Sequence, residues 1–208
     1  MDTPKYDLKL FLQHASGLDL QALIPVFHRW IQTRAVDDLL IDVVDYRHVP
    51  YGPGVILIGH DAHYGIDTAW AGRAGLLYSR RRETHASRAH MQGVQGRLKS
   101  VFHDALTVCR LLATDSTLQG QLQFCTDAFL LRVNDRLQAP NTCDRFEYLH
   151  AQLEPFVQQL YASEAVNVEH LSEPQSSLTV SIKAPYAVPL DDLLRRLDDI
   201  EITVGVGG

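Results

Sequence analysis

Three histidines fall within residues 48–67, the stretch HVPYGPGVILIGHDAHYGID, together with two aspartates. Imidazole and carboxylate groups bind transition metals, and imidazole also exchanges protons near neutral pH. The first question is therefore whether His48, His60 and His63 can meet around one ion or one substrate.

The elements that carry these residues separate them into two groups. Segments 39–46 and 54–60 flank a turn rich in proline and glycine, which predicts a β-hairpin. His48 then lies in the turn and His60 at the far end, roughly six strand residues or about 20 Å away. Because metal–ligand bonds are only about 2 Å long, we expect no ion shared by His48 and His60. The sequence predicts no metal site and no cofactor.

A different site is expected at the His60 end of the hairpin. His60, Asp61 and His63 form a turn, and the strand predicted over 75–82 brings three consecutive arginines back beside it. Bidentate guanidinium groups suit phosphate or carboxylate, and an imidazole adds a donor that titrates near neutrality. The predicted anion site consists of His60, Asp61, His63, Arg80 and Arg82. The alternative is a solvated strand end.

The cysteines give no nucleophilic site. Cys109, Cys125 and Cys143 are an odd number, widely spaced, and the N-terminus has no cationic segment followed by an apolar one. This pattern indicates reduced thiols and a cytoplasmic protein. Cys143 lies at a helix start that Asn141 can cap, but acidic neighbours oppose a thiolate there. We expect a packed or exposed thiol, and its reactivity stays open.

Composition excludes several classes of protein. The chain has 208 residues, a formal net charge of −6, 46% hydrophobic and 21% charged residues. A net negative charge disfavours general nucleic-acid or anionic-membrane binding, and no apolar run approaches the roughly 20 residues of a membrane helix. No dinucleotide-binding, P-loop or nucleophile-elbow motif is present.

Hydrophobic periodicity predicts an α+β fold with a mostly antiparallel sheet. Amphipathic helices are expected over 19–34, 94–113 and 142–161, with strands between them. The first and third of these helices share an L-x-P pattern, at Leu23-Ile24-Pro25 and Leu153-Glu154-Pro155, each followed by two predicted strands.

This pattern predicts two β-α-β-β halves, with an internal duplication as one explanation and chance as the other. Residues 1–84 would form the first half with an extra hairpin, residues 85–118 a bridging helix, and residues 119–208 the second half. We expect one compact domain.

These features favour a cytoplasmic protein that binds a small anionic ligand or a protein partner. The alternative is an enzyme that acts on a small anionic substrate through His60, His63 and the arginines. No catalytic residue is identified beyond that alternative. The sequence names neither ligand nor reaction, and a homo-oligomer stays open.

Overall fold

The computed structural model describes residues 5–15, 18–49, 52–81, 93–118, 120–137, 139–171 and 176–200. Its longer helices are α1 (Leu23–Thr33), α2 (Gly93–Thr114), α3 (Cys143–Tyr161) and α4 (Leu190–Asp199). Short 3-10 turns cover Leu20–Ala22, Trp70–Gly72 and Ser116–Leu118. The strands are β1 (Tyr6–Leu12), β2 (Leu40–Asp45), β3 (Val55–Gly59), β4 (Ala62–Asp67), β5 (Gly75–Arg80), β6 (Phe124–Val133), β7 (Asn167–His170) and β8 (Thr179–Lys183).

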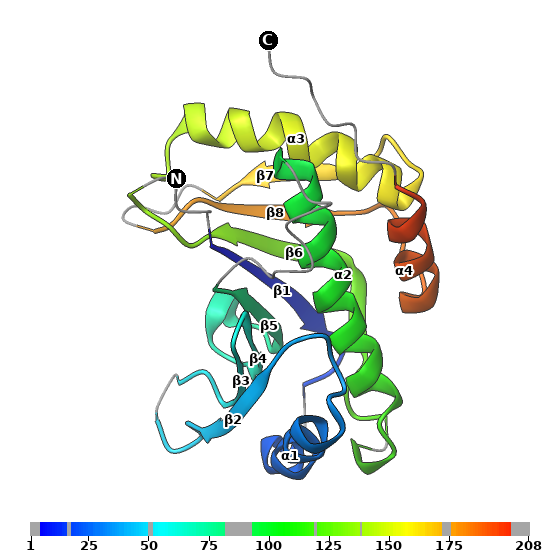
Figure 1. Cartoon of the computed structure of the whole chain (residues 1–208). Coiled ribbons are helices and arrows are strands. Elements are labelled where there is room, and N and C mark those ends of the chain that lie inside the picture. The colour runs from blue at the N-terminus through cyan, green and yellow to red at the C-terminus, as the bar shows by residue number, and fades with distance from the viewer. Residues whose placement is uncertain are drawn as a thin grey trace.

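The eight strands form one sheet in the order β2-β3-β4-β5-β1-β6-β8-β7, and each neighbouring pair is antiparallel. The α+β class and the antiparallel sheet are therefore confirmed. β1 and β6, far apart in sequence, pair at the centre of the sheet. This central pair joins a β2–β5 group to a β6–β8 group, and the sheet twists between them (Figure 1).

One face of the sheet carries the core. Cross-strand pairing aligns a row of apolar and aromatic residues on that face, and the row consists of Val43, Leu57, Tyr64, Tyr78, Leu8, Leu131 and Val180. α2 packs across β1 and β5, α3 lies along the β7 side and α1 lies under β2 and β3 (Figure 1). Side chains alternate between the two faces of a strand, so the next row across belongs to the face opposite these helices.

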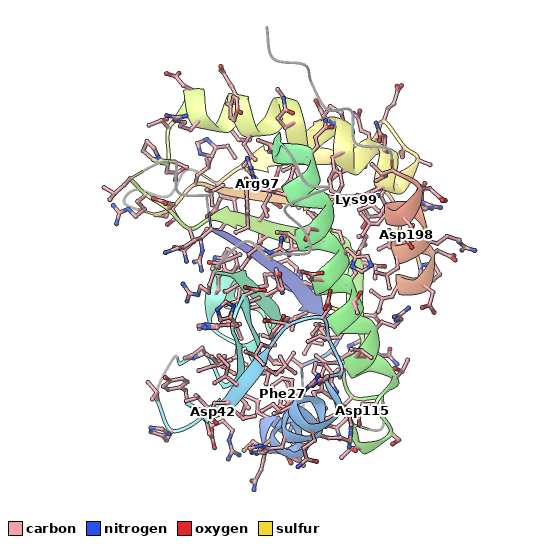
Figure 2. All side chains as sticks on the ribbon, in the orientation of Figure 1. Phe27, Asp42, Arg97, Lys99, Asp115 and Asp198 are labelled. Atoms are coloured by element: carbon pink, nitrogen blue, oxygen red, sulfur yellow. The ribbon has the colours of Figure 1, made fainter. Side chains whose placement is uncertain are left out.

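α1 and α2 are joined through their ends. Arg29 on α1 forms an ion pair with Asp115, which follows α2, and Figure 2 shows Phe27 and Asp115 at this junction. Phe27 is fully buried and packs against Trp30, with ring centroids 5.5 Å apart. The apolar face of α1 thus closes the core beneath β2 and β3, while its polar side reaches α2.

A lysine of α2 caps the C-terminal end of α4. The Lys99 ammonium donates to the carbonyl oxygens of Asp198 and Ile200 at 3.1 and 2.8 Å, and Figure 2 shows Lys99 pointing toward Asp198. The last carbonyls of a helix have no partner within the helix, and a cation there also favours the helix dipole. This contact holds α4 against α2.

Two local expectations are wrong. The run Val55-Ile56-Leu57-Ile58 has no polar alternation, which predicts a strand buried on both faces. In β3, however, Val55, Leu57 and Gly59 are buried while Ile56 and Ile58 are only partly covered. The helices cover one face of this strand and leave the other partly open. Asn141 was expected to cap α3, but Thr142 occupies the cap position, and the Asn141 amide instead donates toward Leu171 and Ser176.

The duplication is not confirmed and stays a prediction: outward from the central pair, the order β1-β3-β2 corresponds to β6-β8-β7 only when the inserted β4–β5 hairpin is left out. β6 pairs directly with β8, whereas the β4–β5 hairpin lies between β1 and β3. The prolines differ as well: Pro25 sits in the first turn of α1, where its missing N–H costs nothing, and Pro155 lies inside α3. The leucine of each L-x-P pattern is fully buried, Leu23 in α1 and Leu153 in α3.

No described helix combines the length and apolar character needed to cross a membrane. The domain limits suggested by the sequence stay predictions. Their last residues, 201–208, lie outside the described part of the chain.

Candidate functional site

The hairpin that separates His48 from His60 is present. Leu40 pairs with Gly59 and the His60 amide donates to the Leu39 carbonyl at one end. At the other end Asp45 pairs with Val55, and His48 follows in the turn. The predicted separation of the two histidines is confirmed.

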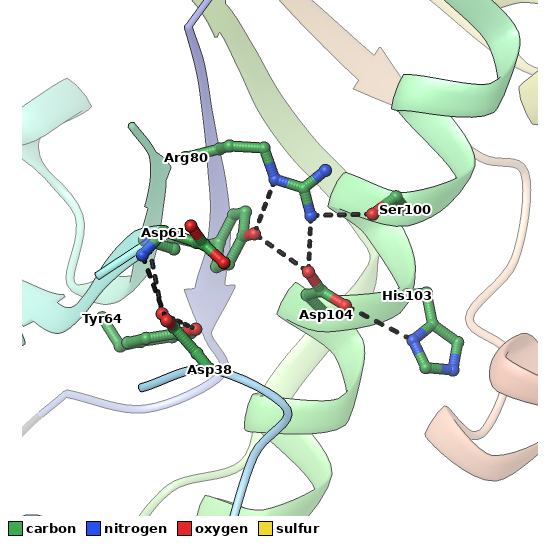
Figure 3. Close-up of polar contacts among 9 residues, drawn as sticks. Asp38, Asp61, Tyr64, Arg80, Ser100, His103 and Asp104 are labelled. Carbon is green, nitrogen blue, oxygen red and sulfur yellow. Dashed lines mark hydrogen bonds and ion pairs between the residues drawn. The ribbon is translucent and has the colours of Figure 1, made fainter. Parts of the chain in front are cut away.

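Arg80 belongs to the helix-covered face of the sheet. It is 5% exposed, and its guanidinium donates to Asp104 at 2.5 Å, to Ser100 at 2.8 Å and to the Tyr78 hydroxyl at 3.0 Å (Figure 3). The Tyr78 hydroxyl in turn donates to Asp104 at 3.1 Å. Burial raises the pKa of Tyr78 well above its usual value, and the Asp104 carboxylate adds to this effect. Arg80 therefore ties β5 to α2 and is already neutralised.

A second carboxylate on this side is also saturated with donors. Asp38 accepts hydrogen bonds from the backbone of Asp61 and Ala62, both at 3.1 Å, and from the Tyr64 hydroxyl at 2.9 Å (Figure 3). The Asp61 carboxylate lies 2.9 Å from the His60 ring. These contacts close the β3–β4 turn and fix its shape. They do not bring the His60 ring to the guanidinium of Arg80.

The predicted anion site is thus divided by the sheet. His63 pairs with Ser79, and Arg80, one residue later, points to the opposite face from Ser79. The arginine that shares a face with His63 is Arg81, whose backbone N–H donates to the Asp61 carbonyl at 2.7 Å. Arg82, also predicted for the site, lies outside the described residues.

A pocket opens on the face away from the helices, with a volume of about 230 Å³. Its polar lining comes from β1, β4, β5, β6 and the segments next to them, and includes Asp7, His63, Ser79, Arg81, Asp67, Arg132 and Asn134. Gly65 lies between His63 and Asp67 on β4 and also lines the pocket. A Cβ atom at Gly65 would come within 2.9 Å of the Val55 carbonyl oxygen. Glycine therefore permits the close strand approach beneath the pocket.

The pocket lies on a polar row that crosses the sheet beside the apolar one. Cross-strand pairs align, in order, Asp42, Ile58, His63, Ser79, Asp7, Arg132 and Thr179. Asp7 accepts from Arg132 at 2.8 and 2.5 Å through a single oxygen, Oδ2. Its other oxygen, Oδ1, is buried and has no hydrogen-bond partner among the described residues.

A buried ion pair borders the same pocket. The Lys9 ammonium, fully buried, donates to Asp67 at 2.5 Å and to the Trp70 carbonyl at 2.5 Å. The Trp70 ring lies against two cations, with the Arg132 guanidinium 4.3 Å and the Lys9 ammonium 5.9 Å from its centroid. Burial lowers the pKa of Lys9, and the Asp67 carboxylate opposes this effect. These contacts join β1, β4, β6 and the Trp70 turn beside the pocket.

His63 and Arg81 are the basic side chains of the pocket that have no carboxylate partner among the described residues. Burial lowers the pKa of His63, and the positive charge of Arg81 lowers it further. His63 is therefore largely neutral at pH 7. Within the described part of the chain no carboxylate forms an ion pair with Arg81, which is exposed at the rim of the pocket. Arg132 and Lys9, in contrast, each have an aspartate.

Nothing among the described residues assembles a metal site: no three His, Cys, Asp or Glu side chains come together in a suitable group. Of the cysteines, Cys109 is buried and Cys143 is exposed. Burial raises the pKa of Cys109 well above its usual value, so it is a packed thiol.

The sequence analysis missed Asp7 and Lys9. Both lie in the first strand, and their signal is the alternation Asp-Leu-Lys-Leu over residues 7–10. That alternation indicates one polar face, but it cannot identify Arg132 and Asp67 as partners. Comparisons with family models, with curated proteins and with solved structures gave no match to this chain.

Proposed function

We infer that the protein binds a small ligand carrying an anionic group, and that the site is the pocket on the helix-free face of the sheet. The observation that carries this proposal is the pairing of His63 and Arg81 at one pocket, with Arg81 at its rim and without a carboxylate partner among the described residues. Guanidinium and imidazole groups recognise phosphate and carboxylate oxygens. The anion site expected from sequence is thereby moved from Arg80 to Arg81.

The charge balance of the pocket supports an anionic ligand. Lys9 and Arg132 are each neutralised by an aspartate, so Arg81 leaves a net positive charge although the chain carries −6 overall. A bound anion would also favour the protonated form of His63, which adds a second charge. Affinity should therefore increase as the pH falls toward the pKa of His63.

Isothermal titration calorimetry with ethyl phosphate tests the proposal. The wild-type protein should bind it saturably, and Arg81→Gln should weaken binding at least about tenfold, the usual loss for a charge-assisted hydrogen bond. Arg195→Gln on α4 is the matched control, because it removes the same charge from a side chain that is 68% exposed and far from the pocket. Equal weakening by both substitutions would indicate a bulk charge effect and would contradict the proposal.

Catalysis at the same pocket is a second candidate, favoured by one observation. His63 and Ser79 are directly opposite on β4 and β5, and a neutral imidazole can act as a general base toward a hydroxyl. No hydrogen bond joins these two side chains in the described structure, so binding is the first choice. Measured hydrolysis of p-nitrophenyl phosphate that disappears in His63→Gln would favour the enzyme.

A further inference from the structure

The proposed anion site occupies one part of the pocket, and the next residues along the strands are apolar. Side chains on one face of a strand recur every second residue, so Gly65 follows His63 on the helix-free face of β4. Cross-strand pairs place Ile56 of β3 on one side of Gly65 and Leu77 of β5 on the other. All of these residues line the pocket. The anion site therefore borders an apolar part of the same pocket.

Gly65 leaves a notch between two apolar walls. It has no side chain, whereas Ile56 and Leu77 on either side of it are partly exposed. Neighbouring strands lie about 4.8 Å apart, so the missing side chain leaves a gap about one strand spacing wide. Pro53 adds apolar surface to the pocket. Covering these walls with an apolar group is favourable, and the narrow gap favours an unbranched carbon chain over a branched one.

Polar residues on both sides of the notch limit the length of that chain. His63 and Asp67 lie two residues to either side of Gly65, about 6.6 Å along the strand in each direction. The Asp67 carboxylate is engaged by Lys9 and by two backbone N–H groups. A longer chain would therefore reach a charged pair and gain no further apolar contact. The pocket volume, about 230 Å³, is also below the roughly 300–1,000 Å³ of sites for drug-sized ligands.

We propose that the ligand of this pocket is a small anion with a short, unbranched hydrocarbon group. Its phosphate or carboxylate lies against Arg81 and His63, and its hydrocarbon group lies in the notch over Gly65, between Ile56 and Leu77. This inference rests on the proposed function and specifies the class of ligand. An inorganic anion such as sulfate would occupy only the part of the pocket at His63 and Arg81.

A series of alkyl phosphates tests the apolar contact on wild-type protein. Methyl, ethyl, propyl, butyl and hexyl phosphate carry the same anionic group and differ only in chain length. We expect affinity to increase about threefold with each added methylene up to butyl phosphate, because each methylene that enters the notch leaves water. Hexyl phosphate should show no further gain. Isothermal titration calorimetry measures each affinity.

Pentanoate and pivalate test the shape of the notch. These two carboxylates have the same number of carbon atoms and the same charge, but pivalate ends in a branched and therefore wider group. Pentanoate should bind at least about fivefold more tightly, because only the unbranched chain enters a gap one strand spacing wide. Competition with butyl phosphate measures both affinities and also shows whether carboxylate and phosphate ligands share the site.

The variant Ile56→Ala removes one wall of the notch, and Ile58→Ala is its matched control. Both isoleucines lie on the same face of β3 and are partly exposed, but of the two only Ile56 lines the pocket. Ile56→Ala should reduce the ratio of butyl to methyl phosphate affinity at least about threefold, and Ile58→Ala should leave this ratio unchanged. The chain-length series needs no variant, so it decides the question if Ile56→Ala fails to fold.

The outcomes separate this inference from the proposed function. If methyl and butyl phosphate bind equally, or if pivalate binds as tightly as pentanoate, the inference is overturned while the anion site stands. A gain that continues unchanged to hexyl phosphate, or an equal loss in both isoleucine variants, would also overturn it, because general apolar surface would then be responsible. If no member of either series binds, the proposed function fails and this inference fails with it.

Discussion

Asp7 and Leu8 are neighbours in β1, yet they belong to two rows that cross the sheet on opposite faces. The row through Leu8 is apolar or aromatic from Val43 to Val180 and is covered by helices. The row through Asp7 carries aspartate, histidine, serine and arginine and faces away from the helices. A core row stabilises by excluding water, and any side chain of the right size serves. The polar row adds little stability through exclusion of water. Its residues are therefore better candidates for a function than those of the apolar row.

The two faces also treat their polar groups differently. On the helix side, Arg80, Tyr78 and Asp104 hydrogen-bond one another (Figure 3). On the open side, Lys9 and Arg132 each pair with an aspartate, whereas the guanidinium of Arg81 has no carboxylate partner among the described residues.

The largest effect is expected for Lys9→Met. Removing the ammonium leaves Asp67 buried and unpaired, and breaking a buried ion pair costs about 3–5 kcal/mol. The double variant Lys9→Met/Asp67→Asn should recover a large part of this loss, because an asparagine still accepts the backbone N–H of Trp70 and carries no charge. Urea denaturation of the single and the double variant gives the free energy of unfolding of each and tests both expectations. A loss below about 1 kcal/mol for the single variant would show that the polar face is not held by this pair.

Leu8→Ala and Ser79→Ala compare the two rows directly. Leu8 is fully buried beneath α2, so truncation should destabilise by about 3 kcal/mol through lost burial and the cavity left behind. Ser79 forms no side-chain hydrogen bond within the described chain, so its truncation should cost less than about 0.5 kcal/mol. Similar losses for both variants, measured by urea unfolding, would remove the distinction between a structural row and a functional one.

The sequence predicted the positions of helices and strands better than it predicted which face of the sheet each side chain occupies. Apolar periodicities predicted α1, α2, α3 and the β2–β3 hairpin within a few residues of their observed bounds, because local apolar patterns determine these elements. Arg80 and Arg81 show what periodicity could not decide: in a run of three arginines nothing marks which one turns toward the helices, and a shift of one residue exchanges the faces. Arg80 turns toward the helices, and the proposed anion site takes Arg81 in its place.

Long-range pairing was also hidden. Lys9 and Asp67 are 58 residues apart, and they meet only because the β4–β5 hairpin inserts beside β1. The L-x-P pattern predicts two equivalent halves, but it does not show that the β4–β5 hairpin lies between β1 and β3. Contacts between strands that are distant in the sequence can be predicted only when the strand order is known. The sequence alone did not determine that order.

The smallest effect is expected at His103, where the helix-side network reaches solvent. A hydrogen bond to Asp104 raises the pKa of His103 above its usual value of 6.5. A folded pKa above the unfolded one stabilises the fold below pH 6.5, and this contribution is lost as the pH rises through the folded pKa. Both side chains are more than a third exposed, so solvent limits the effect to a few tenths of a kcal/mol.

Urea unfolding at pH 6 and pH 8 checks this expectation. Wild-type protein should lose slightly more stability than His103→Gln on going to the higher pH. An identical pH dependence in both proteins would mean that the Asp104 network does not extend to His103.

The most direct test of the account is a titration of the histidine side chains by ¹H–¹⁵N NMR, with and without sulfate, whose charge is constant over this pH range. The account predicts that sulfate raises the pKa of His63 from its lowered value and shifts its ring resonances saturably. Chloride at equal ionic strength should not reproduce the effect. A His63 pKa that sulfate leaves unchanged, in protein that remains folded, would contradict the claim that this pocket binds anions.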